Sequence, residues 1–496
     1  MGSDFRDFIV AHLANGRPGV ADLCAYFFLR AHSLVKSDSG LCGLLATNTI
    51  AQGDTREVGL EQIITDQLPQ RTTIIRAVSS APWPGVAALE VAHIWLCRGV
   101  WQGEHVLDGK SVSGITPDLS VTASVSGKPL RLAANKDKSF IGSYVLGVGL
   151  LLTPDEAQKL IEKDARNRKV LWPYLNGEDL NSRPDQSPSR WVINFQDWPV
   201  ERCVNENWFD ADKKQQEIWF RSGRVPKDYP EVVAADFPDC LDIVERLVKP
   251  ERAKNNRAVY RNRWWVFAER QVNAYSATAG FQRVLVAAQT SKHLSVSFVP
   301  NGIVFTHMTV VFAFNNGGVF ALLTSTHHEL WVRKYAATLE TRMRYIPTDC
   351  FETFPFPKND QQLNAIGDRY HESRRQLMMT RQEGLTKTYN RFHDSSERSE
   401  DIAELRSLHV EIDQAVAAAY GWNDLDLDHG FHETKQGVRY TISEFARRTV
   451  LDRLLALNHQ RHAEEEAEKA SQPFSAPAKR GGKRRRDLDK LTLDLL

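Results

Sequence analysis

The first hundred residues alternate between helical and strand-like patterns of apolar positions. Residues 21–34 form an apolar-rich stretch typical of a helix, and residues 40–46 form a short continuous apolar run. Such a run, followed by a polar loop, is typical of a strand buried on both faces of a sheet. Residues 72–78 and 88–96 predict two further strands. Strands separated by helical segments indicate an α/β sheet.

The middle of the chain, up to Pro357, mixes strand-like runs with aromatic residues. Residues 191–195, 283–288 and 309–314 are examples of such runs. Residues 354–357 read Phe-Pro-Phe-Pro, a sequence that breaks any helix and predicts a domain boundary.

The C-terminal third shows helical spacing instead. One helix is predicted by apolar residues at three- and four-residue spacing: Ile402, Leu405, Leu408, Ile412 and Val416. Gly421 follows it as a C-terminal cap. A second helix is predicted by its apolar positions: Phe445, Leu451, Leu454 and Leu455. From Ser471 onward the chain contains Pro and Ala and then becomes strongly basic, which is typical of a flexible tail.

The composition is that of a globular protein. The chain has 496 residues, of which 42% are hydrophobic and 25% are charged, so several domains are expected and wholesale disorder is excluded. No run reaches the ~18 apolar residues of a membrane span, and the first residues show no signal peptide. We therefore expect a cytoplasmic protein without a membrane partner. The six cysteines are widely scattered, which excludes a C-x-x-C zinc site and favours reduced thiols.

Common catalytic and metal motifs are missing from the sequence. It contains no phosphate loop, no nucleophile elbow and no H-E-x-x-H zinc motif. The pairs His327 with His328 and His459 with His462 lack a ligand set with metal-site spacing. We expect these to be ordinary surface or capping histidines, and we expect no metal.

A basic and aromatic segment stands out between residues 249 and 265. Its cations are Lys249, Arg252, Lys254, Arg257, Arg261 and Arg263. Cations interleaved with aromatic residues neutralise phosphates and pack against sugars or bases, which predicts contact with DNA. A solvated helix face followed by two core tryptophans, Trp264 and Trp265, explains the same composition equally well. The net charge of +1 favours neither, and the basic run 479–486 fits either nonspecific nucleic-acid binding or simple solvation.

Three short runs form an ordered set near the start of the chain: residues 17–30, residues 44–53, and residues 81–85 before a strand. The set resembles the stretch downstream of the catalytic motif in adenine-specific DNA methyltransferases of the gamma arrangement. More closely, it resembles the type IIG and IIL restriction–modification fusion enzymes and their phage-defence relatives. The resemblance continues through residues 171–180, 190–195, 248–252, 344–345, 350–357, 383–390, 405–409 and 419–422.

Two motifs of that family are missing: the Gly-rich motif for S-adenosylmethionine and the Asn-Pro-Pro-aromatic motif that holds the target amine. The chain therefore resembles a C-terminal half. The resemblance implies an α/β fold: the C-terminal part of a Rossmann-like methyltransferase sheet, then a mixed α/β target-recognition domain, then a helical C-terminal region. The expected bounds are 1–102, 103–357 and 358–470, followed by a basic flexible tail at 471–496.

The resemblance also implies roles for residues near the sheet. Trp83 would stack on the flipped-out adenine, because a duplex base must be extruded before its amine can be reached. A core tryptophan beside a Pro-Gly turn is the alternative for Trp83. Thr47 and Asn48 would lie at the carboxyl end of a strand, where ligand crevices open in α/β sheets.

One helix of the first domain would border the cofactor and target pocket with Asp22, Tyr26 and Phe27. Simple helix packing is the alternative explanation for Tyr26 and Phe27.

The function implied is site-specific recognition of double-stranded DNA and adenine-N6 methylation with S-adenosylmethionine, in a restriction–modification or phage-defence system. Without the missing motifs nothing aligns the amine with the methyl donor. We therefore expect no activity without an N-terminal methyltransferase, or nuclease–methyltransferase, partner chain that carries most of the cofactor site. Two alternatives stay open: a non-catalytic DNA-binding specificity subunit, and the remnant of a truncated methyltransferase gene.

Overall fold

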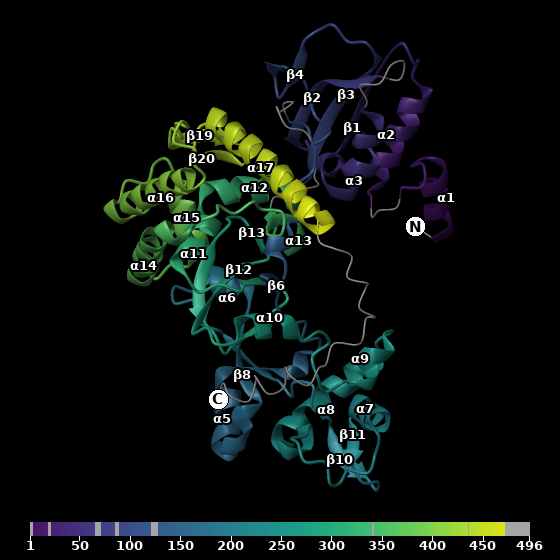
Figure 1. Cartoon of the computed structure of the whole chain (residues 1–496), viewed down its shortest axis with the longest axis vertical. Coiled ribbons are helices and arrows are strands. Elements are labelled where there is room, and N and C mark those ends of the chain that lie inside the picture. The colour runs from purple at the N-terminus through teal and green to yellow at the C-terminus, as the bar shows by residue number, and fades with distance from the viewer. Residues whose placement is uncertain are drawn as a thin grey trace.

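The computed structural model describes residues 3–17, 21–64, 71–84, 89–120, 127–339, 342–434 and 436–471. It confirms the expected α/β class, with several sheets and many helices (Figure 1). The predicted basic tail at 472–496 lies outside the described residues. No helix within the described ranges has the length and apolar character that crossing a membrane requires.

The N-terminal part is a five-stranded sheet. Its strands in spatial order are β1 (Ser39–Thr47), β3 (Glu90–Gly99), β2 (Thr72–Pro82), β4 (His105–Leu107) and β5 (Lys110–Val112). β3 runs antiparallel to both of its neighbours, so β1 and β2 point the same way. The helices of this part are α1 (Ser3–His12), α2 (Leu23–Leu34), α3 (Gly53–Val58) and α4 (Leu60–Ile63).

These helices share one core with one face of the sheet. Phe28 of α2 and Leu60 of α4 are buried in the same cluster as Ile74 and Ile94 of the sheet. The opposite face carries Leu41 of β1, which is 60% exposed. The expectation that this strand is buried on both faces therefore holds for one face only, within the described residues.

The N-terminal part also extends past the expected boundary at residue 102. β4 pairs with β2, and β5 pairs with β4. Ile115 and Leu119 are buried in the same core as α2 and β3. The core of this part therefore ends near Leu119, because a hairpin beyond residue 102 adds two strands to the sheet.

Two further four-stranded sheets form the middle of the chain. One consists of β14 (Val296–Pro300), β12 (Arg283–Ala288), β16 (Thr309–Phe312) and β6 (Ser139–Ile141), all antiparallel. The other consists of β15 (Val304–Phe305), β8 (Leu171–Leu175), β9 (Arg190–Ile193) and β7 (Leu151–Leu152). The predicted strand runs in this region correspond to β9, β12 and β16.

Smaller elements surround these sheets. The helices are α5 (Pro154–Lys163), α6 (Gly177–Ser182), α7 (Lys213–Ser222), α8 (Pro238–Ala253), α9 (Ala258–Asn262), α10 (Val272–Thr278) and α13 (Pro347–Cys350). The strands are β10 (Glu201–Val204), β11 (Arg224–Pro226), β13 (Thr290–Ser291), β17 (Ala337–Leu339) and β18 (Arg342–Arg344). The elements from α7 to α9 and the pair β10–β11 lie at the far end of the molecule from the N-terminal sheet (Figure 1).

The C-terminal region is helical, as the spacing predicts. Its helices are α11 (Gly317–Thr324), α12 (Thr326–Tyr335), α14 (Asn364–Arg381), α15 (Leu385–Phe392), α16 (Glu400–Ala419) and α17 (Glu444–Ser471), with a hairpin of β19 (Gly430–Thr434) and β20 (Gly437–Thr441). All five spaced residues predicted for the first helix are buried in α16. In α17, Leu454 and Leu455 are buried, but Phe445 is 75% exposed, so its predicted place on the packed face is wrong.

The expected boundary after Pro357 does not separate two cores. Phe312 of β16, Phe320 of α11, Tyr370 of α14 and Ile402 of α16 belong to one buried cluster. The helical region therefore packs directly on the central sheet.

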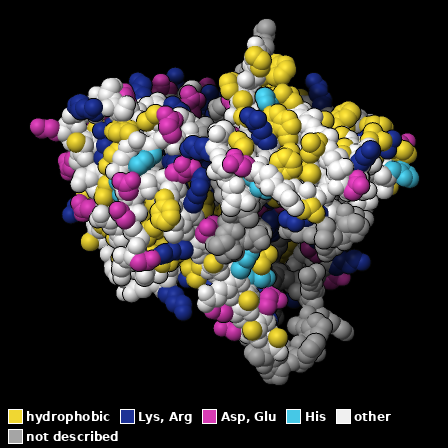
Figure 2. All heavy atoms as spheres, turned by 90° about the horizontal axis from the view of Figure 1, so that it is seen from above, with side chains coloured by type: hydrophobic (Ala, Val, Ile, Leu, Met, Phe, Trp, Pro, Cys, Tyr) yellow, Lys and Arg dark blue, Asp and Glu magenta, His cyan; other side chains and the backbone are white. Residues whose placement is uncertain are grey.

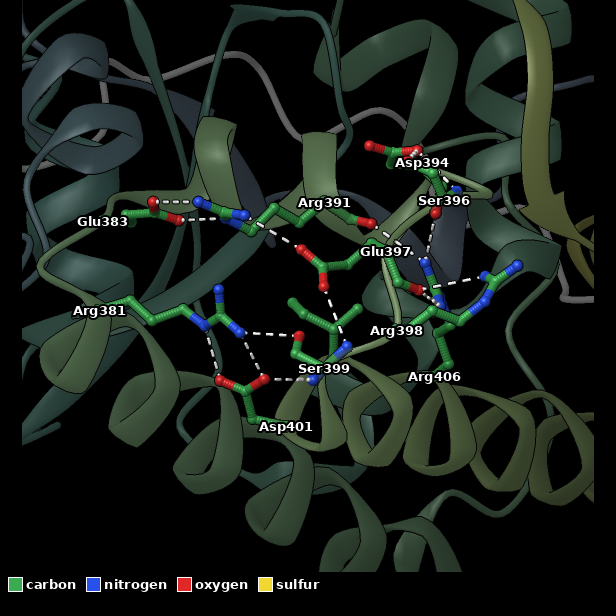
Figure 3. A network of polar contacts seen from close by, with 11 residues as sticks. Arg381, Glu383, Arg391, Asp394, Ser396, Glu397, Arg398, Ser399, Asp401 and Arg406 are labelled. Atoms are coloured by element: carbon green, nitrogen blue, oxygen red, sulfur yellow. Dashed lines mark hydrogen bonds and ion pairs between the residues drawn. The ribbon is translucent and has the colours of Figure 1, made fainter.

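Ion pairs fix the turn between α15 and α16 (Figure 3). Arg391 bridges Glu383 at 2.9 Å and Glu397 at 3.0 Å. Arg381 of α14 binds both carboxylate oxygens of Asp401 at 2.6 Å. Because these pairs connect α14, α15 and α16, the three helices are held in one arrangement.

Candidate nucleic-acid interface

β1 and β2 flank β3 and finish at the same end of the N-terminal sheet. A chain of hydrogen bonds connects them: Asn48 Nδ2 donates to Ser80 Oγ at 3.3 Å, and Ser80 Oγ donates to Glu90 at 2.8 Å. Thr47 Oγ1 lies 2.7 Å from Thr49 Oγ1. Thr47 and Asn48 therefore lie together at the end of the sheet where β1 finishes, beside the end of β2.

Trp83 follows β2 at this same end of the sheet. Its main-chain N–H donates to the carbonyl of Leu89 at 2.8 Å, which fixes the backbone. Its side chain is 41% exposed. Trp83 is therefore not a core tryptophan.

The start of α2 approaches the end of β1. Asp22 caps α2 by accepting from the main-chain N–H of Cys24 at 3.4 Å. The thiol of Cys24 lies 4.0 Å from Thr47 Oγ1. Burial, followed by the charge of Asp22, raises the pKa of that thiol to about 11, so it stays protonated. Asp22 thus fixes the start of α2, and Cys24 rather than Asp22 is the residue of this helix that approaches Thr47.

The two aromatic residues of α2 differ in their surroundings. Tyr26 is 5% exposed and belongs to the core of the N-terminal part. Phe27 is 68% exposed. Packing accounts for Tyr26, whereas Phe27 presents an apolar surface to the outside.

Two cations of the basic segment point inward. The guanidinium of Arg252 is buried and donates to the carbonyls of Val145 at 2.6 Å, Leu146 at 2.6 Å and Arg263 at 3.1 Å. Burial lowers its pKa to about 10, which leaves it charged at neutral pH. Arg263 lies 3.6 Å from the carboxylate of Asp197. This geometry gives Arg252 a structural role and leaves it no free donor face for a phosphate.

The other four cations of the segment are exposed: Lys249, Lys254, Arg257 and Arg261. Arg261 donates to the main-chain carbonyls of Asn255 and Asn256, and Arg257 donates to the hydroxyl of Tyr260 at 2.8 Å. A carbonyl or hydroxyl partner does not neutralise a guanidinium, so both residues keep their charge for an anionic ligand. Lys249 differs, since it pairs with Glu245 at 2.5 Å.

The tryptophans of this segment behave as the alternative explanation predicts. Trp265 is 1% exposed, and its indole N–H donates to the carbonyl of Trp198 at 2.8 Å. Trp264 is partly buried under the ammonium of Lys249, which lies 4.8 Å from its ring centre. The segment therefore combines an exposed basic face with core tryptophans.

A second cationic and aromatic surface was missed from the sequence. The guanidinium of Arg168 lies 5.6 Å from the ring centre of Trp191 on β9. The indole N–H of Trp172, on the neighbouring strand β8, donates to the carbonyl of Lys169 at 3.2 Å. The three cations Arg166, Arg168 and Lys169, shortly before Trp172, are the sequence signal that points to this surface.

The histidines expected at the surface are partly inside the molecule. His327 and His328 on α12 are fully buried, and burial lowers the pKa of His328 to about 3. They are inside because α12 packs between α16 and the segment around Phe354. Within the ranges that the structure describes, no group of His, Cys, Asp and Glu side chains could hold a metal ion.

One family model matches part of the chain. Residues 234–358 match the model of the MmeI target recognition domain. The matched range contains α8, α9 and the whole basic segment, and it ends one residue after the predicted boundary at Pro357. The expected resemblance to a restriction–modification enzyme is thereby supported for its target recognition domain.

A solved structure extends the likeness over the chain. The fold is similar to that of the type IIL restriction–modification enzyme MmeI, solved in complex with DNA, with a TM-score of 0.63 and 17% sequence identity. The similarity covers 93% of this chain and 55% of MmeI, so the chain spans about half the length of that enzyme. At this identity the likeness concerns the fold. The search of curated proteins gives no match.

Proposed function

We propose that the chain recognises a specific sequence in double-stranded DNA as part of a restriction–modification or phage-defence system. The observation that carries the proposal is the match of residues 234–358 to a target recognition domain, within a fold similar to an enzyme solved with DNA. The exposed cations Lys254, Arg257 and Arg261 lie inside that range. They would neutralise phosphates and set the orientation of the domain on the duplex.

The catalytic part of the proposal is adenine-N6 methylation from S-adenosylmethionine. Trp83 would stack on the extruded adenine, and its exposure at the same end of the sheet as Thr47 and Asn48 supports this role. The described residues do not offer a complete cofactor cradle, because Asp22 already caps α2 and Asn48 already donates to Ser80. They would form only the border of the cofactor site.

We further propose that another polypeptide completes the N-terminal sheet and supplies the cofactor site. β1 is the edge strand of the sheet that the described residues form, and an open strand edge is a template for pairing. Large apolar side chains are exposed throughout this part of the chain: Phe5, Phe8, Leu23, Phe27, Leu34, Leu41, Leu45, Trp83, Leu89, Trp95 and Val100. Figure 2 shows hydrophobic side chains gathered in its right half, over the N-terminal elements. Surfaces of this kind are typical of interaction sites.

A non-catalytic DNA-binding specificity subunit is the second candidate function. It is favoured by the family match, which lies wholly outside the N-terminal sheet.

Co-expression separates the two candidates. The chain is produced with a polypeptide that carries the Gly-rich and Asn-Pro-Pro-aromatic motifs, and methylated adenines are mapped in genomic DNA. Methylation at one sequence motif, lost on Trp83→Ala with DNA binding retained, is the expected result. A stable complex that binds one DNA sequence but leaves every adenine unmodified would favour the specificity subunit.

A further inference from the structure

Helix α17 carries a packed stripe that changes from apolar to polar along its length. Ala446, Val450 and Leu454 are four residues apart and fully buried in one cluster with Trp331 and Phe354. Asn458 is the next position of the stripe and is also fully buried. A buried amide has to be hydrogen-bonded, so its partners identify what the helix holds at this level.

One partner of Asn458 lies in residues 127–134, which connect the N-terminal part to the central sheets. Its Oδ1 accepts from the main-chain N–H of Leu130 at 2.8 Å, and its Nδ2 donates to the carbonyl of Leu130 at 2.8 Å. The same Nδ2 donates to the carbonyl of Thr353 at 2.6 Å. One side chain thus joins α17, the connecting segment and the end of the target recognition domain.

Two residues on the C-terminal side of Asn458 extend this contact. The ring of His459 donates to the carbonyl of Lys128 at 2.8 Å. The carboxylate of Glu465 accepts from the main-chain N–H groups of Ala133 at 2.7 Å and Ala134 at 3.1 Å. Residues 128–134 therefore lie along two turns of α17 and are bound to it mainly through their backbone.

Charged side chains carry the contact on to the N-terminal part. The ammonium of Lys128 pairs with Glu57 of α3 and lies 3.7 Å from Glu61 of α4. Lys110 of β5 lies 3.5 Å from Glu444 in the first turn of α17. The N-terminal part is therefore connected to α17 directly at Glu444 and, through Lys128, at His459.

A third connection involves α12. Asp118 pairs with Lys334, and the ammonium of Lys334 also donates to Ser120 Oγ at 3.0 Å. The neighbouring Leu119 is buried in the N-terminal core. Asp118 therefore ties the end of that core to the target recognition domain.

We infer that α17, residues 128–134 and the Asp118–Lys334 pair form an interdomain clamp. The clamp fixes the orientation of the N-terminal sheet relative to the target recognition domain, and Asn458 is its central residue. Figure 1 shows α17 lying between the C-terminal helices and the N-terminal sheet. The clamp consists of contacts within the chain and forms whether or not the chain takes part in methylation.

The first test uses Asn458→Asp in the full chain. The variant keeps the shape of the side chain and the acceptor for Leu130, but it loses both bonds donated to carbonyls. Hydrogen exchange of residues 127–134 should accelerate roughly tenfold for each lost bond, while α14 and α16 keep their protection. The control is Gln460→Ala, an exposed residue of the same helix that donates only to Glu464 at 2.8 Å. Unchanged exchange in 127–134, or equal acceleration throughout α16, would overturn the clamp.

The second test is a charge reversal read by small-angle X-ray scattering. Lys128→Glu places one carboxylate against those of Glu57 and Glu61 and should increase the radius of gyration of the full chain. Combining it with Glu57→Lys restores opposite charges and should return the radius to that of the parent. A double variant as expanded as the single one, or a single variant as compact as the parent, would show that this pair does not hold the two parts together.

Discussion

Replacing Leu41 and Leu45 with Asn should weaken binding of the proposed partner polypeptide with little effect on the free chain. Both residues lie on the edge strand β1, and they are 60% and 51% exposed. Full burial of a leucine side chain stabilises by about 1.5–3 kcal/mol. Covering the fractions that are still exposed would therefore contribute about 1.7–3.3 kcal/mol in total, which corresponds to a roughly 20- to 250-fold change in Kd.

The assay is isothermal titration calorimetry of the double variant against a polypeptide that bears the first strands of the sheet. Surface substitutions are usually within about 0.5 kcal/mol of neutral, so the free energy of unfolding of the unbound chain should not change measurably. Val438→Asn is the matched control, because Val438 is 46% exposed on the remote hairpin strand β20. Binding of the double variant with the parent's Kd would show that the partner does not cover Leu41 and Leu45. A loss of stability in the free chain as large as the loss in binding would contradict the prediction as well.

Four other predictions concern separate parts of the molecule. Arg257→Ala combined with Arg261→Ala should weaken DNA binding for all sequences, and the slope of log K against log salt should fall by about one unit per lost phosphate contact. Arg375→Ala on α14 is the control and should change neither the affinity nor the slope. An unchanged slope in the double variant would mean that this segment is only a solvated helix face. Arg252→Ala should lower the free energy of unfolding by about 3 kcal/mol or more, because it leaves buried carbonyls unpaired; a variant as stable as the parent in urea would contradict the structural role. Burial raises the pKa of Asp118, but the nearby Lys334 brings it down to about 2, below the ordinary 3.8. The stability that Asp118 contributes is therefore present above pH 4 and is lost as the pH falls toward 2. The difference in thermal unfolding between the parent and Asp118→Asn should vanish over that window, and a constant difference would speak against the pair. The purified chain alone should transfer no tritiated methyl group from S-adenosylmethionine to DNA, and measurable transfer would mean that the missing motifs are dispensable.

The spacing of apolar residues predicts burial correctly where one face of a helix packs on one core. The spaced apolar residues from Ile402 to Val416 are all buried in α16, because one face of a helix meets one core. Phe445 shows the limit of the same reasoning. It is apolar and helical and adjoins the buried Ala446, but it lies outside the stripe of Ala446, Val450 and Leu454, and nothing in the local sequence reveals which side of this turn meets the core.

Long-range contacts account for what the sequence could not predict. Arg252 belongs to a basic run, but its acceptors are the carbonyls of Val145 and Leu146, about a hundred positions earlier in the chain. Asn458 is one polar residue in a charged helix, and its partner Leu130 is 328 positions away. The exposure of Trp83 and the burial of Tyr26 likewise depend on packing across the N-terminal sheet. A single sequence does not record which distant backbone groups will need a partner.

Selection from random duplexes tests whether residues 234–358, which match a target recognition domain, read a DNA sequence. The purified chain is incubated with a random double-stranded library at physiological salt, and bound DNA is sequenced over several rounds. A specific protein binds its site typically 10³–10⁷ times more tightly than other DNA. We expect the chain to enrich one short motif, and the surface variant Gln460→Ala to enrich the same motif. Binding with no enriched motif, at an affinity set by salt alone, would contradict it.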